Sequence, residues 1–146
     1  MTLLTNREIS NVKFPLYYIF VDTSYGFKKI CILTEVEAKV KLEKEEEKGK
    51  VQILNTVWKQ LNWKEQNEIY SKCTKVNAST GQSEIDYTKY RDLKIKCCLI
   101  DWDYLENNQK IKVTAEIIDQ LNPDVVIALF NKYEDITTIE VKDRGN

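Results

Sequence analysis

Two runs of β-branched and aromatic residues near the start of the chain constrain its fold most strongly. The runs are "FPLYYIFVD" and "FKKICILT", and the "TSYG" between them ends in Gly26, which adopts a positive φ at little cost. They predict a β-hairpin with strands at residues 16–21 and 27–33. Because two strands alone are not stable in water, the hairpin must pack against another part of the chain.

Two capping boxes predict helices after the hairpin. Thr34 and Asn62 each precede a glutamate by three residues, which predicts helices over residues 35–50 and from residue 63 onward. Between them, the apolar residues of "VQILNTVWKQL" fall at helical spacing. We therefore predict another helix over residues 51–61.

Single cap residues predict three more helices in the C-terminal half. Asp86, Thr114 and Asn122 stand at N-cap positions, and Pro123 occupies the first position of the last helix. Asn107-Asn108 predicts a turn between the first two of these helices. The predicted fold class is α+β, mainly α-helical, with an N-terminal β-hairpin packed against a helical C-terminal part.

Size and composition favour one domain over residues 1–146. The chain has 42% hydrophobic and 31% charged residues and a formal net charge of −1, which argues against a disordered chain and a membrane protein. Its basic residues lie among acids, without the extended positive surface that nucleic-acid binding requires. The charged stretch 43–50 leaves a subdivision into residues 1–48 and 51–146 as an alternative.

The longest apolar run, residues 14–21, is shorter than the roughly 20 residues that a spanning helix needs. The N-terminus also lacks the pattern of a signal peptide. We therefore expect a cytoplasmic protein without a membrane partner.

The neighbouring Cys97 and Cys98 invite a chemical interpretation, but their spacing favours packing. They lack the two-residue gap that lets thiolates chelate zinc or exchange as a redox pair. The residues at helical spacing across this region predict a buried stripe with Cys97 on it and Cys98 beside it. The predicted stripe consists of Tyr87, Tyr90, Leu93, Cys97 and Ile100.

The acidic residues that follow imitate the start of a calcium loop. Asp101, Asp103 and Glu106 have the spacing of its first ligands, but Leu105 and Glu106 stand where the loop needs an oxygen ligand and then glycine. We expect Asp101 and Asp103 to flank a buried Trp102 instead.

The residue inventory removes most catalytic mechanisms. The chain has no histidine, which excludes Ser-His and Cys-His nucleophiles and histidine metal sites. Its four glycines cannot form a phosphate-binding loop. We expect no catalytic, cofactor-binding or metal-binding residues. An enzyme of a histidine-free type remains an alternative, because the chain has 23 acids that could include a catalytic pair, although no pair stands out.

Because the sequence does not favour catalysis or cofactor binding, we expect this protein to act by binding other proteins. The chain has 3 tryptophans and 8 tyrosines, residue types that are enriched in interfaces. The candidate interface residues are Tyr17, Tyr25, Trp58 and Trp63.

Four sequence elements across residues 61–134 occur in a fixed order. They are "W-x-E-x-N-E", "T-G-x-x-x-x-D-x-x-K-Y-R", a tryptophan that ends a predicted helix, and "L-x-P-D-V-x-x-A-L". This layout resembles the small tail-assembly chaperones of long-tailed bacteriophages. The matching positions are Trp63, Glu65, Asn67, Glu68, Thr80, Gly81, Asp86, Lys89, Tyr90, Arg91, Trp102, Leu121, Pro123, Asp124, Val125, Ala128 and Leu129.

The resemblance implies a function in virion morphogenesis without catalysis or cofactors. Such chaperones hold the tape-measure protein, recruit tail-tube subunits in the host cell cytoplasm, and leave before the tail matures. The N-terminal hairpin departs from the family pattern. A permanent structural subunit of the phage tail, baseplate or neck, located in the virion tail, is therefore the alternative. A homo-oligomer is left open.

Overall fold

The computed structural model describes residues 11–138, in which strands and helices alternate along the chain. The elements are β1 (Val12–Asp22), β2 (Lys28–Leu33), α1 (Glu35–Leu42), α2 (Glu45–Lys48), β3 (Gln52–Trp58), α3 (Trp63–Cys73), β4 (Thr74–Val76), β5 (Ser83–Ile85), α4 (Tyr87–Cys98), β6 (Leu99–Trp102), β7 (Leu105–Glu106), β8 (Gln109–Lys110), α5 (Ala115–Gln120) and α6 (Pro123–Thr137).

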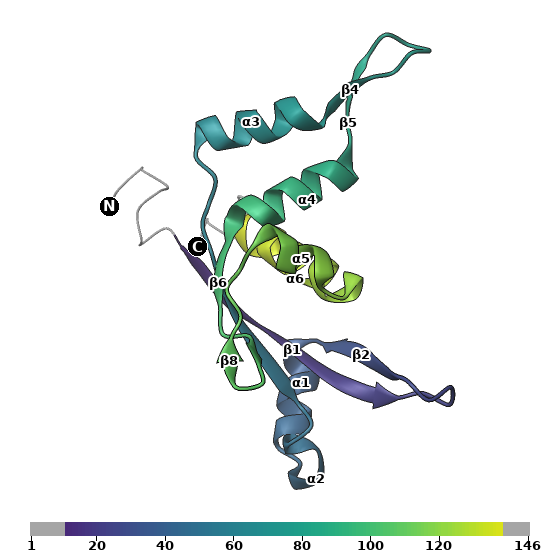
Figure 1. Ribbon diagram of the computed structural model, residues 1–146, viewed down its shortest axis with the longest axis vertical. Helices are drawn as coiled ribbons and strands as arrows, with labels where there is room; N and C mark the ends of the chain where they lie inside the picture. The colour runs from purple at the N-terminus through teal and green to yellow at the C-terminus, as the bar shows by residue number, and fades with distance from the viewer. Residues whose placement is uncertain (1–10, 139–146) are drawn as a thin grey trace, which may run out of the picture.

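A four-stranded antiparallel sheet with the order β2-β1-β3-β6 forms the centre of the molecule (Figure 1). β1 is the longest strand and pairs with β3 along its first part and with β2 along its second. The predicted hairpin is confirmed as β1–β2, with Gly26 at φ +85° in its turn. The β1–β3 pairing joins the two sides of the suggested boundary near residues 43–50.

The prediction of a mainly helical fold is wrong. Helices account for 44% and strands for 30% of the described residues. The largest difference is at residues 51–61, where the structure has β3 instead of a helix. The spacing of the apolar residues there is compatible with a helix and with a strand. Pairing with β1 on one edge and with β6 on the other stabilises the strand.

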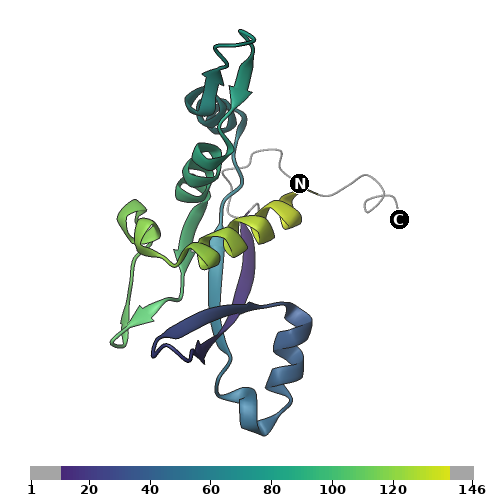
Figure 2. The ribbon, with the colours of Figure 1, turned by 90° about the vertical axis from the view of Figure 1, so that its right-hand side faces the viewer.

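Alternate residues of β3 are buried, which places one face of this strand in the core. Leu54, Thr56 and Trp58 alternate with more exposed residues and point to the face that carries the main core. On the same face, β1 contributes Phe14 and Leu16, which pair with Thr56 and Leu54. α5 and α6 lie over this face, and Figure 2 shows α6 crossing it.

Trp58 is the centre of the core. Its ring stacks on Phe14 at 5.6 Å and on Tyr133 of α6 at 4.8 Å between centroids. Its indole N–H donates to Thr56 Oγ1 at 2.8 Å, and that hydroxyl donates to the Phe14 carbonyl at 2.9 Å. Trp58 and Thr56 therefore bury their polar atoms with partners, as a dry core requires.

Residues 59–98 form an arm that is inserted between the neighbouring strands β3 and β6. α3 and α4 pack side by side, with β4 and β5 at the far end (Figures 1 and 2). The rings of Tyr70 and Tyr90 stack between the two helices at 5.5 Å. At the base, the Lys59 N–H donates to the Cys98 carbonyl at 2.8 Å, which closes the insertion where it leaves the sheet.

Lys94 fastens this arm to α6. Its ammonium lies 2.5 Å from Glu134 Oε1 and 3.0 Å from the Tyr90 hydroxyl. Burial lowers the pKa of Lys94, but these two partners outweigh it and hold the pKa above its ordinary value. Lys94 thus stays charged while it is almost fully buried.

The starts of α1, α3, α4, α5 and α6 were predicted correctly from their cap residues. Thr34 and Asn62 form the two capping boxes, and Asp86, Thr114 and Asn122 cap α4, α5 and α6. The predicted helix over residues 35–50 is interrupted between α1 and α2, where Lys44 is extended and Lys41 lies 3.6 Å from Glu47 across the bend. Asn107 and Asn108 both have positive φ in the β7–β8 turn, as predicted.

The predicted buried stripe of α4 is wrong in phase. Lys94, Ile95 and Cys98 are buried, whereas Tyr87 is 75% exposed and Ile100 lies in β6. Cys98 is the core cysteine, and Cys97 is only half-buried. The reason is that α4 packs against both α3 and the main core. Which of its residues are buried therefore depends on these two neighbours, and the apolar spacing along the helix does not predict it.

We predict that Trp58→Ala lowers the free energy of unfolding by about 3–5 kcal/mol, because it removes the ring between Phe14 and Tyr133. Trp63→Ala is the matched control, since Trp63 is 80% exposed and should change stability by less than about 1 kcal/mol. Urea denaturation followed by circular dichroism measures both. Equal effects of the two substitutions would contradict the assigned core.

A candidate binding pocket

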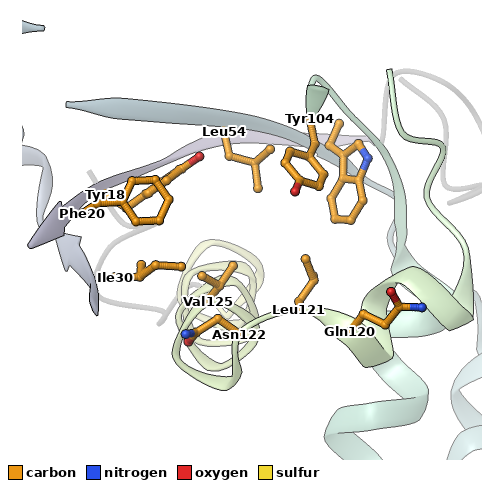
Figure 3. Close-up of a pocket in the computed structure, with 10 residues that line it drawn as sticks. Tyr18, Phe20, Ile30, Leu54, Tyr104, Gln120, Leu121, Asn122 and Val125 are labelled. Atoms are coloured by element: carbon orange, nitrogen blue, oxygen red, sulfur yellow. The ribbon is translucent and has the colours of Figure 1, made fainter. Parts of the chain in front are cut away.

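An apolar pocket of about 180 Å³ opens on the core face, between the sheet and the turn that joins α5 to α6 (Figure 3). In this view, residues of β1 and β3 lie on one side, residues of α6 lie opposite, and Tyr104 closes one end. The lining residues are Tyr18, Phe20, Ile30, Leu54, Trp102, Tyr104, Gln120, Leu121, Asn122 and Val125.

The pocket exists because the hairpin extends beyond the helix that covers the sheet. β1 pairs with β3 only as far as Tyr18, and its last residues continue with β2 alone. α6 begins at Pro123, so its first turn reaches the pocket wall through Val125 and does not cover Phe20. Phe20 points to the same face as buried Leu16 but is 51% exposed. The apolar face of the sheet is therefore longer than its helical cover.

The polar groups of the pocket are two phenols and two amides, and the two phenols stay neutral near neutral pH. Burial, followed by the nearby Asp103 carboxylate, raises the pKa of Tyr18. The hydrogen bond from Tyr104 to Glu106, at 2.8 Å, raises the pKa of Tyr104, and burial adds to it. The amides of Gln120 and Asn122 complete the polar lining. Neutral phenols and amides can orient a bound polypeptide by hydrogen bonding. They do not provide the general acid and general base that catalysis of proton transfer requires.

Exposed apolar side chains continue from the pocket along the end of the hairpin. We call the group Phe20, Val21, Tyr25 and Phe27 the hairpin end; their exposed fractions are 51%, 39%, 88% and 57%. Phe20 and Val21 are successive residues of β1, so the hairpin end exposes apolar side chains on both faces of the sheet. Several exposed apolar side chains close together are characteristic of sites that bind another protein. The pocket and the hairpin end together form the candidate binding site.

The four residues predicted for an interface lie in different places. Tyr25 belongs to the hairpin end, and Trp63 lies at the start of α3, far from the β1–β2 turn in Figure 1. Tyr17 is half-buried and points to the opposite face from Tyr18. Trp58 has no exposed surface, so the expectation that it contacts a partner is corrected: it is the core residue described above.

The sequence analysis missed the pocket residues Tyr18, Phe20 and Tyr104. A signal for the first two was present, because Phe14, Leu16, Tyr18 and Phe20 alternate along β1 and predict one apolar face. No local signal places Tyr104 opposite them.

Asp101 and Asp103 have structural partners. Asp101 lies 2.9 Å from Lys110, and this hydrogen bond lowers the pKa of Asp101. Asp103 accepts hydrogen bonds from the Asn55 backbone and side-chain N–H groups at 2.8 and 2.7 Å. Trp102 between them is buried, as predicted, and donates to the Ile111 carbonyl at 2.6 Å.

A second polar cluster lies at the base of the arm. Lys59 forms an ion pair with Glu65, whose Oε2 also lies 3.7 Å from Cys97 Sγ. Burial raises the pKa of the Cys97 thiol, with Lys59 opposing it, and burial raises the pKa of Cys98 to about 12. A nucleophilic cysteine needs the opposite shift. This cluster therefore joins the arm to the core instead of activating a thiol.

Within residues 11–138, no group of three or more cysteine and carboxylate side chains is arranged to hold a metal ion. The helices of this part of the chain are also too short or too polar to cross a membrane.

Comparison of the chain with protein-family models, with curated proteins and with solved structures finds no match.

We predict that Cys73 and Cys98 resist alkylation in the folded protein, because burial raises both thiol pKa values and shields both side chains. Mass spectrometry after iodoacetamide treatment at mildly alkaline pH should find them unmodified, and labelled once denaturant is added. Cys31 and Cys97, which are half-buried, serve as internal references. Rapid labelling of Cys98 in the native protein would contradict the assignment.

We predict that Glu65→Gln destabilises the protein at neutral pH by about 1 kcal/mol, because it weakens the capping box of α3 and removes the partner of Lys59. Burial alone would raise the pKa of Glu65, but Lys59 and the Asn62 N–H hold it below its ordinary value. The stabilisation is therefore present above the ordinary carboxyl pKa and is lost as the pH falls through the lowered value.

Thermal unfolding at several pH values measures this difference. The gap between wild type and Glu65→Gln should narrow in acid, whereas Glu68→Gln, on the exposed side of the same helix, should leave stability nearly unchanged. A gap that stays constant down to strongly acidic pH would refute the assigned pairing.

Proposed function

We propose that this protein acts without catalysis in bacteriophage tail morphogenesis, as a tail assembly chaperone that binds tape-measure and tail-tube proteins in the host cytoplasm. The observation that carries the proposal is the apolar pocket and its continuation into the hairpin end. This surface offers apolar area and a few hydrogen-bond donors, which is the chemistry of a protein-binding site.

The size of the site suits reversible binding. A pocket of about 180 Å³ accommodates one or two large side chains of a partner. Burial of a single leucine or phenylalanine contributes roughly 1.5–3 kcal/mol, far less than a permanent subunit contact requires. A chaperone that must release its client benefits from such a limited contact.

The resemblance to tail-assembly chaperones supports the proposal where its motif meets the pocket. Two residues of the "L-x-P-D-V" element, Leu121 and Val125, line the pocket, and Pro123 between them begins α6. Other motif residues stabilise the fold: Glu65 completes a capping box and Asp86 caps α4. The motif thus combines residues that line the pocket with residues that begin the two helices of the arm.

A permanent subunit of the tail, baseplate or neck is the alternative within the same process. Exposed apolar surface is equally compatible with a lasting contact in the virion tail. The two functions differ in whether the protein remains in the mature particle.

The test uses the phage or prophage that encodes the chain. Interruption of its reading frame should yield filled heads without tails in electron micrographs, and the wild-type chain supplied in trans should restore tailed particles. We expect Phe20→Ala, at the pocket, to restore fewer tailed particles than Tyr87→Ala, at an exposed aromatic residue of α4 outside the candidate binding site.

Mass spectrometry of purified tails then separates the two functions. A chaperone should be absent, and a fixed copy number in mature tails would identify a structural subunit instead. Normal yields of tailed particles without the chain would refute a function in tail assembly.

A further inference from the structure

Two carboxylates without a cationic partner lie at the edge of the pocket on the core face. Glu106 accepts a hydrogen bond from the pocket residue Tyr104, and Asp124 lies next to the pocket residue Val125 at the start of α6. Among the described residues, neither carboxylate forms an ion pair. We call Glu106 and Asp124 the acidic rim.

The neighbouring lysines do not neutralise the acidic rim. Lys28 pairs with Asp22 at 3.8 Å, Lys96 with Asp119 at 2.6 Å, and Lys110 with Asp101 at 2.9 Å. Lys29 occupies the register position next to Lys28 and therefore points to the opposite face of the sheet. Within residues 11–138, the rim carboxylates form no ion pair with these lysines or with exposed Lys112, which follows β8 in the sequence.

We propose that the pocket binds a basic amphipathic segment of a partner protein, in which a large apolar side chain is flanked by lysine or arginine. The apolar side chain fills the space between Phe20, Leu121 and Val125, and the flanking cations face the acidic rim. This inference rests on the proposed function and names the kind of client segment that the site selects.

Electrostatics favour such a partner over a second copy of this chain. A two-fold contact through the pocket would place one acidic rim against another, because an isologous interface opposes identical surfaces. Repulsion between two negatively charged rims would disfavour this dimer. A positively charged partner would instead associate faster and would be favoured over uncharged or acidic partners. Each exposed pair contributes only about two- to fivefold in affinity, so the apolar side chain supplies most of the binding.

The experiment measures binding of short synthetic peptides to the purified full-length protein by fluorescence anisotropy. One peptide places leucine and tryptophan among lysines, and the matched peptide has glutamate in place of each lysine. We expect the lysine peptide to bind roughly tenfold more tightly at low ionic strength, and the difference to shrink at high ionic strength.

Matched variants locate the binding on the protein. Phe20→Ala should weaken the lysine peptide about fivefold or more, whereas Tyr87→Ala, at an exposed aromatic residue of α4 outside the pocket and the hairpin end, should leave it unchanged. Glu106→Gln with Asp124→Asn should reduce the preference for lysine over glutamate, and Glu45→Gln, in α2 outside the pocket, should not. Circular dichroism verifies that each variant is folded.

Either of two peptide results would overturn the inference: equal affinity for both peptides, or equal effects of Phe20→Ala and Tyr87→Ala. A change in oligomeric state on Phe20→Ala, measured by light scattering, would also overturn it, because it would identify a second copy as the occupant. These outcomes are separate from failure of the proposed function. Tail assembly that depends on the chain, together with no preference for lysine, would refute only the inference about the client segment.

Discussion

The stack of Phe14, Trp58 and Tyr133 is the interaction on which the rest of the structure depends. It joins β1, β3 and α6, which come from the beginning, middle and end of the described chain. The Tyr133 hydroxyl also donates to the Lys59 carbonyl at 2.8 Å, so the same stack fixes the point where the arm leaves the sheet. Aromatic rings bury large areas and stack with a defined geometry. One cluster therefore sets the position of sheet, helix and arm together.

The candidate binding site follows from where this stack lies. α6 is held over the first half of β1 by Tyr133 and Leu129, and its first turn stops short of the hairpin end. The alternation that buries Phe14 and Leu16 continues to Tyr18, which is half-buried against the core, and to Phe20, which is 51% exposed. A fold that needed only stability would shorten or polarise this strand end. Its apolar character is the feature that the proposed function explains.

The site was only partly predictable. Tyr25 was recognised as a candidate for a partner surface, but Tyr18 and Phe20 were not, although the same apolar alternation includes them. Tyr104, which follows β6, and Gln120, which ends α5, could not be predicted as pocket residues. Their places opposite β1 depend on the pairing of β6 with β3, whose residues are distant in sequence. Trp58 shows the opposite error, since an aromatic residue suits both an interface and a core and only its neighbours decide between them.

The sequence by itself determined the β1–β2 hairpin, the starts of α1, α3, α4, α5 and α6, and the β7–β8 turn. Each depends on contacts within a few residues, such as Thr34 with Glu37, Asn62 with Glu65, or the positive φ of Asn107 and Asn108. Only the tertiary structure decided that residues 52–58 form a strand and that Cys98, and not Cys97, enters the core. Strand pairing and burial depend on residues that are distant in sequence, and the sequence of a short apolar run does not specify which of them it will pack against.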